Sequence, residues 1–131
     1  MTPLRFWLGV ALAGAVAGCA HDGPAFNTPP SDVKVVEMHT TLRFSPETLT
    51  ISRGQTVQWS NKAIMTHTVA FDPSKVKDPA DVSLPAGVTP FTSGEVMSGQ
   101  TWTHKFTVPG TYHYVCQPHE GLGMKGTIIV Q

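Results

Sequence analysis

The sequence predicts an all-β domain built as a Greek-key β-sandwich of about seven or eight short strands. Two observations predict this fold class. Apolar and polar residues alternate with a period of two in most segments after residue 33, as half-buried strands require. The chain of 131 residues also contains 12 Gly and 11 Pro, which supply the turns that separate short strands. No repeat or heptad is visible, and no long helix is needed.

Residues 1–18 are expected to be an export signal. Arg5 provides a positive charge, and an apolar run from 6 to 18 follows that is too short to span a bilayer. The run ends in Val16-Ala17-Gly18-Cys19, which resembles the lipobox of bacterial lipoproteins, where the Cys becomes lipid-modified. The alternative is an ordinary signal with Cys19 incidental. Both interpretations place the domain outside the cytoplasm, in the periplasm or an equivalent compartment.

Residues 19–32 form a tether that contains Pro and Gly and shows no helical or strand period. As a flexible coil it would reach roughly 20 Å. With Cys19 lipidated, the segment would anchor the domain of residues 33–131 to a membrane surface.

The first half of the domain is expected to form four strands. Residues 33–38 are rich in Val, and Pro46 then marks a bend because it removes a ladder donor. Leu49 and Ile51 alternate with polar residues over 48–52, and Trp59 belongs to the alternating segment 56–60. The fourth strand is expected over 67–71.

The second half begins with the least regular segment, residues 72–100, where repeated Pro and Gly break any long element. We expect this segment to cover one edge of the sandwich. Three further strands are expected over 101–106, 111–116 and 125–131. Alternation in the second of these places Cys116 on the inward face together with Tyr112 and Tyr114.

Three metal-binding side chains follow one another at the end of that strand. Cys116, His119 and Met124 have the spacing C-x2-H-x4-M. Thiolate and thioether favour Cu(I), and imidazole also binds Cu(II), so the set suits one copper ion that changes oxidation state. His67 is the best fourth donor. Two His and one Cys with a weak axial Met form the pattern of blue-copper electron-transfer sites.

At these residues the chain resembles the cupredoxins, most closely the plastocyanin group. The resemblance lies in the segment from Cys116 to Met124, in the segment that begins at His67, and in 44–46 and 54–61. It implies an electron carrier that is not an enzyme and that docks transiently with a redox donor and a redox acceptor. It also implies that His119 reaches the surface in an apolar docking patch formed by Pro118 and Leu122.

Two positions depart from the plastocyanin pattern. Thr68 stands where the group usually has Asn, which braces the ligand loops, and Val115 stands where it has Tyr. No acidic cluster is evident either. The resemblance therefore does not imply a photosynthetic partner or a remote acidic docking site.

Composition and donor type weigh against the alternatives. With 9 basic and 9 acidic residues the chain has no net charge, so nucleic acid is not expected as a partner. Zinc in proteins is bound by Cys, His and carboxylates, so a zinc-binding structural module would not explain Met124. An oxidase or nitrite reductase needs a second copper centre, and Val115 and Gln117 flank the Cys where such enzymes often have His. A copper carrier or chaperone without a shuttle role remains the alternative function. The domain is expected to be a monomer.

The remaining histidines and methionines are not expected to bind the metal. His39 and His104 lie outside the motif and are expected to be surface or satisfied side chains, and alternation points His113 away from the core. Met38, Met65 and Met97 are more simply packing residues.

Overall fold

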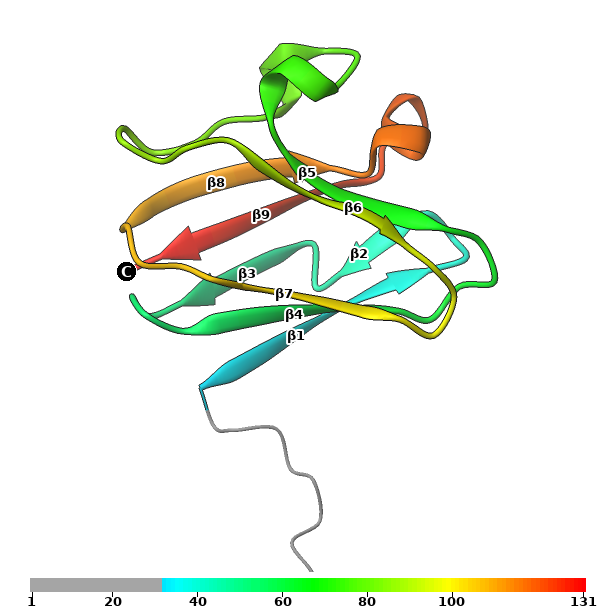
Figure 1. Ribbon diagram of the computed structural model, residues 1–131, viewed down its shortest axis with the longest axis horizontal. Helices are drawn as coiled ribbons and strands as arrows, with labels where there is room; N and C mark the ends of the chain where they lie inside the picture. Colours follow the sequence, from blue (N-terminus) through cyan, green and yellow to red (C-terminus); the bar gives the residue numbers. More distant parts are fainter. Residues whose placement is uncertain (1–31) are drawn as a thin grey trace, which may run out of the picture.

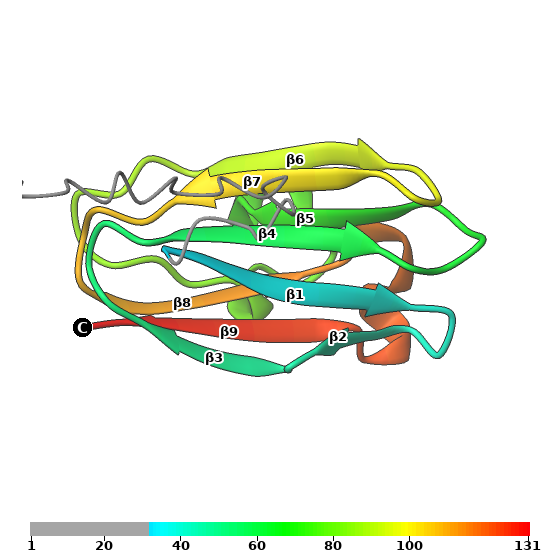
Figure 2. The ribbon, with the colours of Figure 1, turned by 90° about the horizontal axis from the view of Figure 1, so that it is seen from below.

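The computed structural model describes residues 32–131, which form two β-sheets packed face to face (Figures 1 and 2). The expected export signal, the lipidated Cys19 and most of the tether lie outside the described residues. Within residues 32–131, no helix is long and apolar enough to cross a membrane.

One sheet has four strands in the order β2-β1-β4-β7. They are β1 (Val33–His39), β2 (Arg43–Ser45), β4 (Thr56–Asn61) and β7 (Thr101–Lys105). β1 runs parallel to β4, whereas the other two pairs are antiparallel.

The other sheet has five strands in the order β3-β9-β8-β5-β6. They are β3 (Thr48–Ile51), β5 (His67–Phe71), β6 (Phe91–Val96), β8 (Gly110–Val115) and β9 (Lys125–Val130). β3 pairs with β9 in parallel and the remaining pairs are antiparallel. The copper-binding side chains expected from the sequence all belong to this sheet or to the loop that follows β8.

The fold class is confirmed, and the described residues contain nine strands rather than seven or eight. Two strands were not predicted. β2 lies next to Pro46, where the sequence predicts a bend, and β6 lies within residues 72–100, where the sequence predicts no regular element. β6 is an edge strand interrupted by a bulge opposite β5, at Gly94 with φ of 66°, so its sequence lacks clean alternation.

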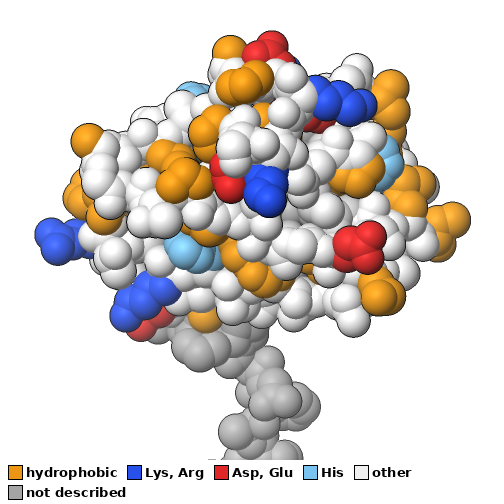
Figure 3. Space-filling model, turned by 45° about the horizontal axis from the view of Figure 1, so that its top comes forward, with side chains coloured by type: hydrophobic (Ala, Val, Ile, Leu, Met, Phe, Trp, Pro, Cys, Tyr) orange, Lys and Arg blue, Asp and Glu red, His pale blue; other side chains and the backbone are white. Residues whose placement is uncertain are grey.

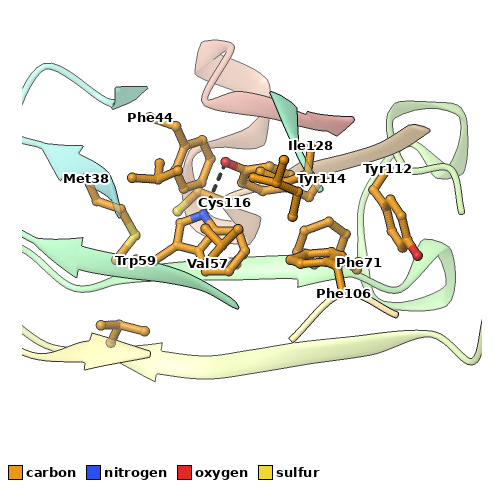
Figure 4. Close-up of a cluster of buried hydrophobic side chains, with 14 of the residues drawn as sticks. Met38, Phe44, Val57, Trp59, Phe71, Phe106, Tyr112, Tyr114, Cys116 and Ile128 are labelled. Carbon is orange, nitrogen blue, oxygen red and sulfur yellow. Dashed lines mark hydrogen bonds between the residues drawn. The ribbon is translucent and has the colours of Figure 1, made fainter. Parts of the chain in front are cut away.

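The sandwich core is rich in aromatic side chains (Figure 4). Trp59 and Tyr114 are fully buried on facing sheets, and the indole Nε1–H donates to the Tyr114 hydroxyl at 3.1 Å. Phe44 and Phe71 each lie 4.7 Å from Tyr114, centroid to centroid. Tyr114 is two residues before Cys116, so this packing fixes the strand that presents the thiol.

Three 3-10 turns lie outside the sheets. η1 (Pro73–Lys75) and η2 (Pro79–Asp81) follow β5, and η3 (Gln117–Leu122) follows β8. Asp72 and Asp78 cap the first two, since their carboxylates accept the backbone N–H of Ser74 and Ala80. Figure 1 shows η1 and η2 in green and η3 in orange, on the same side of the five-stranded sheet.

Candidate metal centre

The four predicted ligands converge at one end of the sandwich. His67 begins β5, Cys116 follows the last residue of β8, His119 lies in η3, and Met124 directly precedes β9. Donor atoms of His67, Cys116 and His119 all lie within 4.8 Å of one another. Met124 is fully buried in the same core cluster as Cys116. The residues singled out in the sequence therefore meet in space.

The separations between donors fit a shared metal ion. Cys116 Sγ lies 3.6 Å from His67 Nδ1 and 3.4 Å from His119 Nδ1. Two donors bonded to one ion at about 2.0–2.3 Å, with an angle near 120°, would themselves lie roughly 3.7 Å apart. The Cys116 sulfur is therefore placed to share one ion with either imidazole.

A hydrogen bond on its far side orients the His67 ring. Its Nε2 lies 3.2 Å from the backbone carbonyl of His39, which can only accept, so Nε2 carries the proton. The lone pair of Nδ1 is then directed at the donor cluster, as is usual for metal-ligating His. Burial, and then the neighbouring His119, lower the pKa of His67, so the ring is neutral and free to bind metal at neutral pH.

The thiol of Cys116 is enclosed, and Thr68 contacts it directly. The backbone N–H of Thr68 lies 3.4 Å from Sγ, and its hydroxyl lies 4.0 Å from Sγ. The same hydroxyl accepts the N–H of Gln117 at 2.9 Å. Burial raises the pKa of the Cys116 thiol, while the Thr68 donors act in the opposite direction. Thr68 therefore braces the two ligand segments, although it is not the Asn that the plastocyanin pattern has there.

The loop between the ligands is closed by its own backbone. The N–H of Cys116 donates to the carbonyl of Met124 at 3.0 Å, and the N–H of Met124 donates to the carbonyl of His119 at 3.3 Å. Gly123 ends η3 with φ of 84°, a left-handed conformation that favours glycine. This turn reverses the chain before Met124, which is fully buried.

Two buried polar residues near the site were not singled out from the sequence. The amide of Asn61 donates to the carbonyls of Met65 and Val96, both at 2.8 Å, and fixes the loop before His67. The second is Glu120, which is only 4% exposed. Both lie in segments that carry the family resemblance, but their residue types alone did not indicate burial, because the backbone groups that they contact leave no trace in the sequence.

The other histidines have separate roles. His104 stacks on Phe91 with centroids 3.9 Å apart, and His113 is exposed with Nδ1 2.9 Å from Thr127 Oγ1. Met38 is buried as predicted, but Met97 is 55% exposed, so its prediction as a packing residue was wrong.

A compact His-Cys-His cluster with a buried Met, on a two-sheet sandwich, defines the class of type 1 copper proteins. A family model described as copper binding proteins of the plastocyanin/azurin family matches residues 31–131. The chain therefore belongs to the plastocyanin/azurin family.

Individual relatives agree with this assignment. The plastocyanin of Scenedesmus fuscus is 39% identical over 90 residues, which cover 69% of this chain and 88% of that protein. The chloroplastic plastocyanin of Tetradesmus obliquus is 35% identical over 125 residues, which cover 94% and 77%. A proline-to-glycine mutant of amicyanin, solved in its reduced Cu(I) form, superposes with a TM-score of 0.62 at 26% identity and covers 79% of this chain and 87% of that one.

Family and site together define the general function. The chain is a type 1 copper electron carrier of the plastocyanin and amicyanin kind, and such carriers are not enzymes. The residues present fit one copper ion, and that ion would supply the one-electron change between Cu(I) and Cu(II).

Proposed function

We propose that His67, Cys116 and His119 bind the copper strongly, that Met124 binds it weakly, and that the protein carries single electrons between two redox proteins outside the cytoplasm. The observation that supports this is the buried donor cluster, with all three atoms within 4.8 Å. Its ligands come from two regions of a rigid sandwich and are held by hydrogen bonds on several sides. If the ligands move little between Cu(I) and Cu(II), little reorganisation opposes each electron transfer.

Electrons would enter and leave through His119, which is half-buried in η3, whereas the other three ligands are fully buried. Exposed apolar side chains lie at the same end of the molecule. Leu122 is 69% exposed and Pro118 is also exposed. Ile64 at 86% and Met97 at 55% extend this surface on the neighbouring loops, although neither was assigned to it from the sequence.

The charge around this end is sparse. On the face in Figure 3, Lys, Arg, Asp and Glu side chains are few and of mixed sign, and apolar side chains lie among uncharged surface across it. Electron carriers of this type dock transiently with redox partners. A small apolar surface suits such a contact, because weak redox complexes bury less area than stable ones.

The docking proposal is tested through the electron self-exchange rate, which needs no knowledge of the natural partner. Leu122→Lys should lower that rate by about tenfold, because two copies would then meet with like charges at the contact. Thr50→Lys, on the exposed side of β3, introduces the same charge away from η3 and serves as the matched control. Equal rates for the two variants would contradict docking through Leu122.

We also propose that residues 1–18 are removed on export and that Cys19 carries a lipid. The support is the small-residue run that ends at this Cys, together with the tether after it. The mass of the protein from a membrane fraction should exceed that of the chain from residue 19 by a lipid modification. Cys19→Ala should release the protein from the membrane. A wild-type protein that carries no lipid would contradict the proposed anchor. The proposal for the copper site does not depend on this result.

A further inference from the structure

A buried carboxylate lies next to the surface-facing ligand and forms no direct ion pair within residues 32–131. Glu120 directly follows His119 and is 4% exposed. Of the three ion pairs among residues 32–131, none includes Glu120. Carboxylates are seldom buried without a cation, because desolvation disfavours the charge. Lys125 lies near enough to interact with Glu120 electrostatically, but it pairs directly with Asp81, so the carboxylate of Glu120 must find its direct contacts elsewhere.

The partners of Glu120 are two consecutive backbone amides. Its Oε2 accepts the N–H of Lys77 and its Oε1 accepts the N–H of Asp78, both at 2.8 Å. Among side chains of this length, only a carboxylate can accept at two oxygens at once. Hydrogen bonds to a charged acceptor are also stronger than neutral ones, so the pair offsets part of the cost of burial.

The two amides belong to a segment that we call the strap, residues 72–82, which contains η1 and η2. Two other side chains also tie the strap to the neighbourhood of the ligands. Gln117 Nε2 donates to the carbonyl of Lys75 at 2.8 Å. Lys125, the residue after Met124, pairs with Asp81 at 2.6 Å. The strap begins directly after β5, so it links the strand that carries His67 to the loop of residues 116–124.

We propose that Glu120 is a positioning residue that locks the loop carrying His119 to the strap, and that its carboxylate supplies a fixed negative charge favouring Cu(II) over Cu(I). This inference rests on copper binding at the site proposed above. Gln117 and Lys125 hold the two ends of the loop, and Glu120 holds its middle, next to His119. Cu(II) carries one more positive charge than Cu(I), so a buried anion nearby stabilises it more.

The test compares Glu120→Gln with Glu95→Gln. Glu95 is an exposed carboxylate on β6, opposite Thr68, so it gives the same change in charge at a solvated position beside the ligand strand. Glu120→Gln should shift the equilibrium with a reference redox couple several-fold toward the reduced protein, because a buried charge is screened less than an exposed one. Glu95→Gln should shift it by less than about twofold. Equal shifts would overturn the electrostatic part of the inference.

Amide hydrogen exchange in the copper-free protein tests the locking role. Glu120→Gln presents an NH₂ group to one of the two N–H donors, so exchange at Lys77 or Asp78 should become several-fold faster. Glu120→Asp keeps the charge but is one methylene shorter. It should also speed exchange at these amides, with the redox equilibrium within about twofold of wild type. Unchanged exchange in both variants would overturn the locking role.

Failure of the Glu120 proposal can be distinguished from failure of the proposed function. A wild-type protein without a copper–thiolate absorption band would contradict the proposed function, whereas the exchange rates of Lys77 and Asp78 need no metal. If Glu120→Gln does not fold, Glu120→Asp carries both tests. Unchanged exchange at Lys77 and Asp78 would overturn the locking role, and a redox equilibrium shifted several-fold although the charge is kept would overturn the electrostatic part.

Discussion

Replacing Thr68 by Val tests the bracing of the ligand segments. The substitution keeps the branched shape but removes the oxygen that accepts the Gln117 N–H at 2.9 Å. An amide left without a partner at a part-buried position costs about 1 kcal/mol, at the low end of the range for buried groups. For a domain of this size, that corresponds to a fall in Tm of roughly 4–8 °C.

The same substitution removes the hydroxyl that lies 4.0 Å from Cys116 Sγ. A donor to the thiolate withdraws electron density from it and disfavours Cu(II), so Thr68→Val should lower the reduction potential. Thr68→Ser retains the hydroxyl and is the matched control. The assays are thermal unfolding of the copper-free protein and a redox titration of the loaded one. A Thr68→Val protein as stable as Thr68→Ser, with the same potential, would refute the bracing role.

Three further substitutions test the packing, the pH dependence and the axial ligand. Gly126→Ala should lower the free energy of unfolding by about 1–3 kcal/mol in a urea titration, because the added Cβ would overlap the ring of Tyr114; an unchanged midpoint would contradict the packing. Burial lowers the pKa of His104 below its ordinary value of 6.5, so the unfolded chain binds the proton more readily and stability falls as the pH drops through that value. His104→Gln should therefore lose less Tm than wild type between pH 7 and pH 5, and an equal loss would contradict this. Met124→Leu should keep the blue colour but change the reduction potential. Loss of the colour would contradict the proposal that Met124 binds the copper only weakly.

Much of the sandwich could be predicted because its strands follow a simple rule. Trp59, Ile51 and Tyr114 occupy alternating positions on half-buried strands, and the structure buries them as expected. β6 could not be recognised, since it is an exposed edge strand with a bulge at Gly94, and its residues lack the apolar alternation of a core strand.

The metal ligands were predictable because their identities carry the chemistry. Cys116, His119 and Met124 lie on one loop, and soft donors at such close spacing are typical of a copper site. Glu120 was not predictable, because its partners are backbone amides 42 and 43 residues away and leave no trace in residue types. The bracing role of Thr68 likewise depends on a contact with Gln117 across 49 residues.

The visible absorption spectrum of the oxidised, copper-loaded protein tests the type 1 copper assignment most directly. We expect an intense blue band from the bond between Cys116 sulfur and copper, bleached by a mild reductant and absent in Cys116→Ser. A colourless wild-type protein at one copper per chain, or an equally intense band in Cys116→Ser, would contradict it.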